Sequence, residues 1–298
     1  MSTLPTTLIS DAMPPEPSTP SLFDELKRTL RSVPILTAVL ALLLIVIVAL
    51  IAQWLGTSDP IAINPGNRLK SASIDHWMGT DAFGRDIYSR VLYGARVSLI
   101  AGLGAAAVSI SVGLVIGVLA GYFRGFDAII MRVMDGLMAI PGILLAIALV
   151  SLSGASLFTV LIAITIPEIP RVVRLVRSVI LSVRNEPYVE AAISLGTPVP
   201  VILWRHLVPN TVAPLIVQGT YIFASAIITE AILSFLGVGL PAEIPSWGNI
   251  MAEGRMYFQM RPGLILYPGI LLSLTVLSVN VLGDAMRDAL DPRMARKL

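Results

Sequence analysis

The sequence predicts an all-α fold: a polytopic membrane protein with six transmembrane helices. Hydrophobic residue types make up 55% of the 298 residues, charged types make up only 13%, and the mean hydropathy is +0.83. An average soluble domain contains about 25% charged residues, because its surface faces water. The high apolar content excludes a disordered chain, and the absence of cysteine excludes a disulfide-rich scaffold.

The elements are predicted in chain order from the apolar segments. Residues 1–33 are expected to form a polar, disordered cytoplasmic tail, because Ser, Thr and Pro are frequent there without an apolar period. The apolar run that follows is too long, and begins too late, for a signal peptide. Segments of about 20 residues, the length that crosses a bilayer, then define a membrane domain over residues 34–298. Its predicted spans are 34–55, 97–122, 128–152, 157–181, 212–237 and 264–284.

Small residues are frequent in the second predicted span, among them Gly113, Gly117 and Gly121. Small side chains let neighbouring helices approach closely in lipid. We expect these glycines to serve helix packing.

The orientation follows from the distribution of Lys and Arg. With a cytoplasmic N-terminus, the inside segments hold twice as many Lys and Arg residues as the outside segments. The positive-inside rule therefore predicts cytoplasmic N- and C-termini, with residues 56–96 and 237–263 outside. Cytoplasmic loops also account for the net charge of +2, so no nucleic-acid partner is expected.

Catalytic motifs are missing from the sequence, which predicts that the chain is not an enzyme. A phosphate-binding P-loop needs Gly-Lys followed by Ser or Thr, and none of Lys27, Lys70 and Lys297 follows a glycine. A zinc site of the two-histidine helical type is excluded, because His76 and His206 are the only histidines and lie far apart.

The segment 186–217 is too polar to span a membrane and too apolar for an ordinary loop. Residues 188–195 can form two helical turns, and Gly196 permits a reversal at positive φ. A second helical segment is expected to end at Pro209, and Ala191 and Ala192 are expected to present one small, smooth surface. Such a hairpin fits a groove of another protein, although a helix lying on lipid fits the pattern as well.

The run EAA, with a glycine four residues later and LVP downstream, resembles the EAA loop of importer-type ABC permeases. The resemblance implies a coupling loop over residues 186–209 that docks on an ATP-binding subunit. The residues that carry this implied role are Tyr188, Glu190, Ala191, Ala192 and Gly196.

The segment HWMGTDAFGRDIYSRVLYGARVSL, residues 76–99, is similar to the C-type permease subunits of the dipeptide, oligopeptide and nickel importer family. Further matches are DGLMAIPGILLAIAL, TEAILSFLGVG, PSWGNI and GDAMRDALDPR. The periplasmic motif of this resemblance consists of Gly79, Thr80, Asp81, Gly84, Arg85, Asp86 and Arg90.

The resemblance implies a type I ABC importer permease in the bacterial inner membrane. It implies three kinds of partner besides the lipid bilayer: a sister permease, two ATP-binding subunits, and a periplasmic substrate-binding protein. Mg-ATP would belong to the ATPase subunits, so this chain would hold no cofactor. The chain would form half of the path for dipeptides, oligopeptides or similar small solutes, and the sequence leaves the solute itself open.

The periplasmic motif also has a physical interpretation. Asp81 with Arg85, and Asp86 with Arg90, have the i,i+4 spacing that supports a helix. We expect an interfacial helix with Ile87, Val91 and Leu92 against the membrane and the charged face in water. This helix could simply orient the second span, or it could contact the sister permease or the binding protein.

Three polar residues within spans are candidates for the translocation path, because polar groups are costly in lipid. Glu168 has Arg171 one turn further on, so a local ion pair is expected. Glu230 lies in an apolar span, where it could line the path or make a buried structural hydrogen bond. An asparagine within a span, such as Asn280, more often bridges helices than contacts a solute. Alternatives are a proton-coupled secondary transporter with Glu168 and Glu230 as carriers, and a membrane scaffold.

Overall fold

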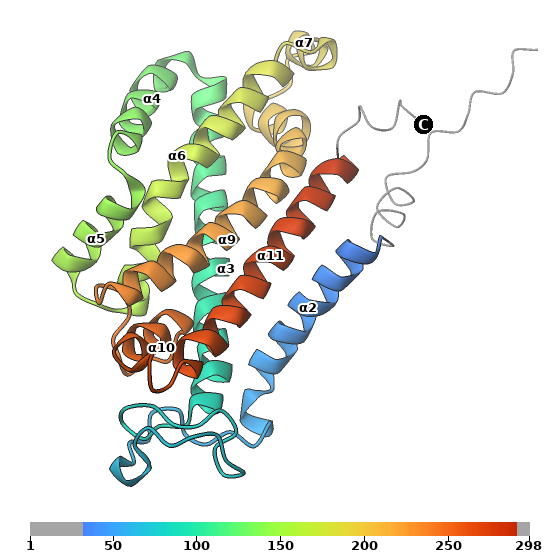
Figure 1. The fold of residues 1–298 in the computed structure, drawn as a ribbon. Helices are drawn as coiled ribbons and strands as arrows, with labels where there is room; N and C mark the ends of the chain where they lie inside the picture. Colours follow the sequence, from blue (N-terminus) through green and yellow to red (C-terminus); the bar gives the residue numbers. More distant parts are fainter. Residues whose placement is uncertain (1–31, 291–298) are drawn as a thin grey trace, which may run out of the picture.

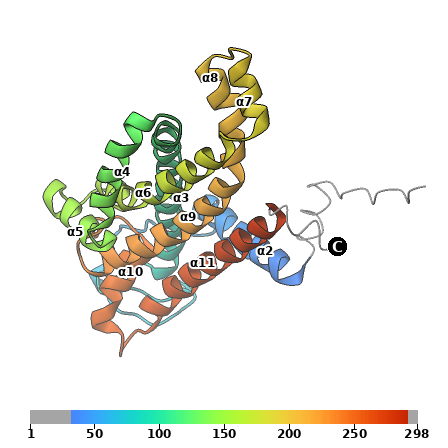
Figure 2. The ribbon, with the colours of Figure 1, turned by 90° about the horizontal axis from the view of Figure 1, so that it is seen from above.

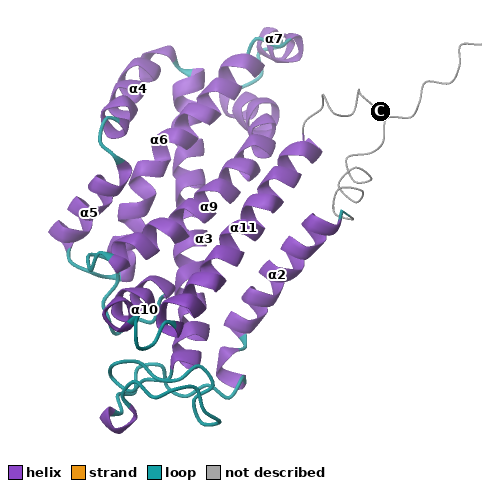
Figure 3. Cartoon of the chain, viewed as in Figure 1, coloured by secondary structure: helices purple, strands orange, loops and turns teal. Residues whose placement is uncertain are grey.

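The computed structural model describes residues 32–290, and this part of the chain is an all-helical bundle without a named strand (Figures 1 and 3). The predicted tail, residues 1–33, lies almost wholly outside the described residues. The long helices are α2 (Val33–Leu50), α3 (Ile87–Tyr122), α4 (Arg124–Met138), α5 (Gly142–Ser153), α6 (Leu157–Val183), α9 (Val212–Phe235) and α11 (Gly263–Leu290). The short helices are α7 (Pro187–Ser194), α8 (Val199–Val201) and α10 (Trp247–Gly254). Helical turns other than α-helix are η1 (Ala52–Trp54), η2 (Pro65–Asn67), η3 (Ile202–Leu207), η4 (Val208–Thr211) and η5 (Arg255–Tyr257).

Each predicted span contains helix, and four helical stretches are long and apolar enough to cross a membrane by length and composition. They are Val33–Leu50, Ile87–Tyr122, Val199–Phe235 and Gly263–Leu290. A fifth is possible if α4 and α5 together make one span.

The predicted span over residues 128–152 is not one continuous helix. The chain forms two helices, α4 and α5, which are bent by 87° at a short break. Pro141 is the cause, because a proline disfavours helical geometry in the residue before it and cannot donate a backbone hydrogen bond. Pro141 instead serves as the N-cap residue of α5, with φ −53° and ψ 125°.

Helix α6 is long enough to span the membrane, but its composition alone does not mark it as a span. It carries Glu168, Arg171, Arg174 and Arg177 within three turns. Two of these charges connect α6 to α4, since Arg174 pairs with Asp135 and Arg177 with Asp127. The side of α6 that faces α4 is therefore polar.

The central helix α3 packs against both α6 and α9, and its glycines make the α6 contact close. A Cβ atom built on Gly117 would lie 2.7 Å from the Cβ atom of Val176. Gly113 and Gly121 meet Val172 and Ile180 in the same way, at 2.5 and 2.7 Å. Because real Cβ atoms do not approach so closely, only glycine permits this packing, as the sequence predicts.

The two ends of the bundle differ. Figure 1 shows α7 at one end, together with the described ends of the chain at α2 and α11, whereas residues 56–86 and α10 lie at the other end. In the view from above, α7 and α8 stand out at the edge of the bundle (Figure 2).

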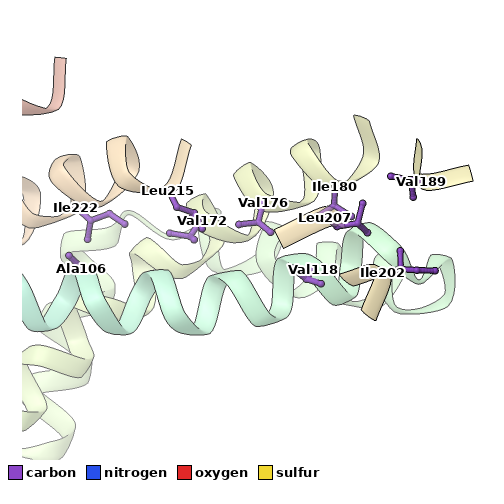
Figure 4. Close-up of a cluster of buried hydrophobic side chains, with 10 residues drawn as sticks. All are labelled: Ala106, Val118, Val172, Val176, Ile180, Val189, Ile202, Leu207, Leu215 and Ile222. Atoms are coloured by element: carbon purple, nitrogen blue, oxygen red, sulfur yellow. The ribbon is translucent and has the colours of Figure 1, made fainter. Parts of the chain in front are cut away.

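A buried apolar cluster anchors the α7 region to the bundle (Figure 4). Val189 of α7 and Leu207 of η3 are fully buried, and Ile202 is nearly so. They join Val176 and Ile180 of α6 in the same cluster. The projecting segment is thus held by side-chain packing, and a displacement of α7 would be transmitted to α6.

Candidate functional site

The α7 helix ends in a turn that depends on Gly196. This glycine has φ +74°, its amide donates to the carbonyl of Ile193, and the amide of Thr197 donates to that of Ala192. These two bonds define a Schellman motif, which favours glycine because a side chain is strained at positive φ. The predicted reversal at Gly196 is therefore present.

One side of α7 is closed to a partner. Ala191 is exposed, but Ala192 is 8% exposed and packs toward the bundle with Val189, so the expected surface shared by both alanines is wrong. Neighbouring helical residues point about 100° apart, which separates the two alanines. The rest of the segment is accessible, including Tyr188, Glu190, Ala191, Ile193 and Leu195.

The second segment of the hairpin does not end at Pro209. Residues Val199–Phe235 form one helical stretch in which the π-helical turn η3 and the 3₁₀ turn η4 lead into α9. The irregular turns accommodate Pro209, and the side-chain amide of Asn210 donates to the carbonyl of His206 at 2.7 Å. The α7 hairpin is therefore continuous with α9.

At the opposite end, the family motif over residues 79–90 builds a compact loop rather than the predicted helix over residues 81–90. Helix α3 begins only at Ile87, and Asp86 caps it by accepting the amide of Ser89 at 2.8 Å. Gly79 and Gly84 have φ of +79° and +75°. A Cβ atom on Gly84 would lie 1.8 Å from the carbonyl oxygen of Asn64, so the loop cannot close around a larger residue.

The charged residues of this motif form a buried ionic cluster, which we define as Asp81, Arg85, Arg90 and Glu253. Arg85 pairs with Asp81 at 2.6 Å, as the spacing predicts. Arg90, in contrast, does not pair with Asp86 as predicted. It pairs with Asp81 at 2.6 Å and with Glu253 of α10 at 2.7 Å. Glu253 also binds Arg85.

The expected charged face in water is therefore wrong. Arg85 and Arg90 are 5% and 1% exposed, and Ile87, Val91 and Leu92 are buried inside the chain. The Oδ1 atom of Asp86 instead lies 3.0 Å from Nδ1 of His76. Spacing along one helix missed Glu253, because it lies more than 160 residues away in the sequence. The remaining motif residue, Thr80, is fully buried and accepts the amide of Lys70.

Glu230 of α9 lies inside the bundle with no exposed surface. Its carboxylate accepts hydrogen bonds from Ser234 and Ser246 at 2.8 Å each and from Ser98 at 3.4 Å. Ser246 also caps α10 through the amide of Asn249. Glu230 thus connects α9 with α3 and α10.

Glu168 and Arg171 of α6 form the expected ion pair, at 2.8 Å. They border a cavity of about 190 Å³ between α5, α6 and α9, to which α9 contributes Tyr221, Ser225 and Thr229. Ser225 donates to Glu168 at 3.4 Å. The guanidinium of Arg171 also lies 5.9 Å from the ring centre of Tyr221.

Two further cavities extend this site along α9. One of about 190 Å³ shares Tyr221, Ser225 and Thr229 and reaches Asn280 of α11. Another of about 490 Å³ begins one turn earlier, at Gln218, and reaches Arg287. We call this set the polar track: Glu168, Arg171, Gln218, Tyr221, Ser225, Thr229 and Asn280.

The polar track separates the three intramembrane candidates. Glu168 and Asn280 lie on it, whereas Glu230 faces away into the α3 side of α9. A polar stripe on the outside of a helix is costly against lipid, so it belongs against water or another protein chain. With the projecting α7 hairpin, this arrangement defines the chain as a subunit of a membrane transport assembly.

Comparison with known proteins identifies the family. The chain belongs to the family of binding-protein-dependent transport system inner membrane components, which matches residues 113–296. The secondary-transporter alternative has no support in these findings.

Named relatives cover most of the chain. It is 53% identical over 247 residues to a probable peptide ABC transporter permease of Sinorhizobium fredii, which covers 83% of this chain and 85% of that protein. It is 41% identical to the dipeptide transport system permease DppC of Alkalihalophilus pseudofirmus, with 95% and 96% covered. It is also 41% identical to the glutathione transport system permease GsiD of Pectobacterium atrosepticum, with 90% of each covered.

A solved structure supports the fold. The inward-facing MetNI methionine ABC transporter matches with a TM-score of 0.50 at 16% identity, over 71% of this chain and 93% of that chain. The family and the named relatives, together with this fold, make the chain a multi-pass permease subunit of an ABC importer.

Proposed function

We propose that the chain is one of two permease subunits of a bacterial peptide importer and that the polar track is its half of the translocation path. The observation that carries this proposal is the polar stripe along α9, which runs between α6 and α11 and opens into cavities that residues 32–290 do not fill. The peptide class is supported by the names of the relatives, which are peptide, dipeptide and glutathione permeases.

The partners follow from the same assignment. A sister permease would cover the polar track, two ATP-binding subunits would meet the α7 hairpin, and a periplasmic binding protein would meet the end formed by residues 56–86 and α10. ATP binding would move α7 and, through the cluster with Val176 and Ile180, the helices of the path. The chain itself would not hydrolyse ATP.

Uptake driven by ATP tests the proposed function. Membrane vesicles that contain the complete transporter and its binding protein should accumulate a labelled dipeptide when ATP is supplied and the proton gradient is collapsed. Accumulation that stops with the gradient, at constant ATP, would contradict the proposal.

The α7 surface can be tested with one substitution at two places. Ala191 and Ala62 are both exposed. They belong to α7 and to the 56–86 segment, which lie at opposite ends of the bundle (Figure 1). Ala191→Trp should release the ATP-binding subunits during purification, because a bulky ring blocks close approach of a partner groove. Ala62→Trp should retain them. Full retention by the Ala191 variant would contradict docking on α7.

We also propose that α7 and both chain termini are cytoplasmic. The chain contains no cysteine, so single cysteines can be introduced at exposed Ser73 and Ser194. An impermeant thiol reagent should label Ser73→Cys from the periplasm and should not label Ser194→Cys. The opposite pattern would reverse the orientation.

A further inference from the structure

The Arg171 side chain has unused hydrogen-bonding capacity on the polar track. Its Nη1 atom donates to both carboxylate oxygens of Glu168, at 2.8 and 2.9 Å. Within residues 32–290, its Nε and Nη2 atoms make no hydrogen bond, and the side chain is 46% exposed at the cavity with Tyr221 and Ser225. The free Nε–Nη2 edge is therefore open to a ligand.

We propose that this edge of Arg171 receives the terminal carboxylate of a peptide as it passes along the track. The inference rests on the proposed function and assigns a substrate group to one place within the path. A guanidinium edge offers two parallel N–H groups, which match the two oxygens of a carboxylate. A peptide's α-carboxyl group is ionised at neutral pH, because its pKa is about 3.5.

Glu168 makes this site suitable for transport rather than for retention. An isolated arginine at membrane depth would hold an anion strongly, because few water molecules or counter-charges compete for it. Glu168 is 7% exposed and paired, so it cancels the charge of Arg171 while it orients the guanidinium. The pair then offers directional hydrogen bonds with little net charge, and a path needs sites that bind weakly enough to release the solute.

The neighbouring side chains support the same assignment. Tyr221 lies beside the guanidinium, and Ser225 and Thr229 continue the polar track by one and two turns. Arg174, one turn from Arg171 on α6, differs because it is paired with Asp135 and borders none of the cavities along α9. It is a matched control, with 43% of its side chain exposed.

The test compares two tracers in the reconstituted transporter with its binding protein and ATP. One tracer is a dipeptide with a free carboxylate, and the other is the same dipeptide with a C-terminal carboxamide. The binding protein is unchanged throughout, so its own preference cancels when each variant's acid-to-amide uptake ratio is divided by the wild-type ratio.

The main variant is the double substitution Glu168→Gln with Arg171→Gln, which removes both charges and leaves no buried carboxylate unpaired. We expect uptake of the free acid to fall about tenfold, because charge-assisted bidentate bonds are lost. Uptake of the amide should stay within about twofold of wild type. Arg174→Gln should leave the ratio unchanged.

Each other outcome has a distinct meaning. An equal fall for both tracers would overturn recognition of the carboxylate and leave the path assignment standing. Unchanged uptake of both tracers would overturn the inference as well. If the double variant does not assemble, Arg171→Lys decides, because lysine keeps the pair with Glu168 but lacks the two-pronged edge. An unchanged ratio in that variant would overturn the proposal. Absence of ATP-driven uptake in the wild type would instead refute the proposed function.

Discussion

The packing of α3 against α6 predicts opposite effects for one substitution at two glycines. Gly117 faces α6, where an added Cβ would lie 2.7 Å from the Cβ of Val176 and 2.9 Å from the carbonyl oxygen of Val173. Gly136 lies in α4, where an added Cβ would meet no atom within 4 Å. We expect Gly117→Ala to destabilise the chain and Gly136→Ala to stabilise it.

The magnitude follows from two contributions. Replacing glycine with alanine inside a helix favours folding by about 0.5–1 kcal/mol, and this contribution is common to both variants. Forcing a methyl group into a filled interface costs about 1–3 kcal/mol, and this contribution applies only to Gly117. Neither neighbouring atom can rotate away, because one is a Cβ and the other is a backbone oxygen. The two variants should therefore differ by about 1–3 kcal/mol in the free energy of unfolding.

Proteolysis of the assembled complex in membranes measures that difference when the protease concentration is low enough that the opened chain recloses faster than it is cut. A tag on this chain follows its cleavage. Cleavage of the transiently opened chain reports the free energy of opening. The reasoning would be refuted if Gly117→Ala resisted cleavage as well as Gly136→Ala. That result would mean that α3 and α6 lie further apart than the structure places them.

Three other substitutions give clear expectations. Glu253→Ala leaves Arg85 and Arg90 with Asp81 as the only carboxylate of the cluster, and breaking a buried ion pair costs about 3–5 kcal/mol; the proteolysis assay should show the loss. Glu230→Gln should lower the amount of assembled complex, because Glu230 connects α9 with α3 and α10. It should not lower the uptake per complex, because Glu230 lies off the polar track. Normal assembly with reduced uptake would contradict this. Gly196→Val should reduce the ATP hydrolysis that the loaded binding protein stimulates, because valine is strained at φ +74° and would distort the α7 turn. Gly154→Val is the control: it introduces strain at φ +83° in the α5–α6 turn and should leave the stimulated hydrolysis unchanged.

The helices were predictable from the sequence wherever one physical property decided the outcome. Long apolar runs produced α2, α3 and α11, and the small residues of α3 produced its close contact with α6. The bend between α4 and α5 was missed because hydropathy averages over a proline. The Ile-Pro-Gly run at residues 140–142 carried the missing signal, since it combines a helix-disfavouring position with a flexible one.

The ionic cluster shows where spacing along one helix fails. The i,i+4 rule applies to charges that remain at a helix surface, where water screens every pair alike. Once Arg90 is 1% exposed, it must satisfy its charge with whichever carboxylates are buried with it. Asp81 and Glu253 supply them, from a loop and from α10. A sequence contains no direct record of such distant pairs.

Composition could not predict which of the two intramembrane glutamates, Glu168 or Glu230, lies on the polar track. The burial of the neighbouring residues on each helix distinguishes them. Around Glu230, the residues one turn away are Ala226, Ile227 and Ser234, all buried, so its side of α9 faces the bundle. Around Glu168, α6 carries Arg171 and Arg174 on an exposed side and Val172 and Val176 on a buried one.

The same contrast explains why α6, a long helix whose composition does not mark it as a span, borders the polar track. Charged side chains are costly in contact with lipid, so the charged side of a membrane helix faces protein or water. On α6 that side faces α4 through Arg174 and Arg177, and faces the cavity beside α9 through Glu168 and Arg171. The charged residues of a membrane helix are therefore informative. In a bundle of apolar helices, they indicate the helix side that faces protein or water instead of lipid. For this family member, that reasoning supports the proposed path along the polar track, and it uses two of the four charged residues that make α6 less apolar than an ordinary span.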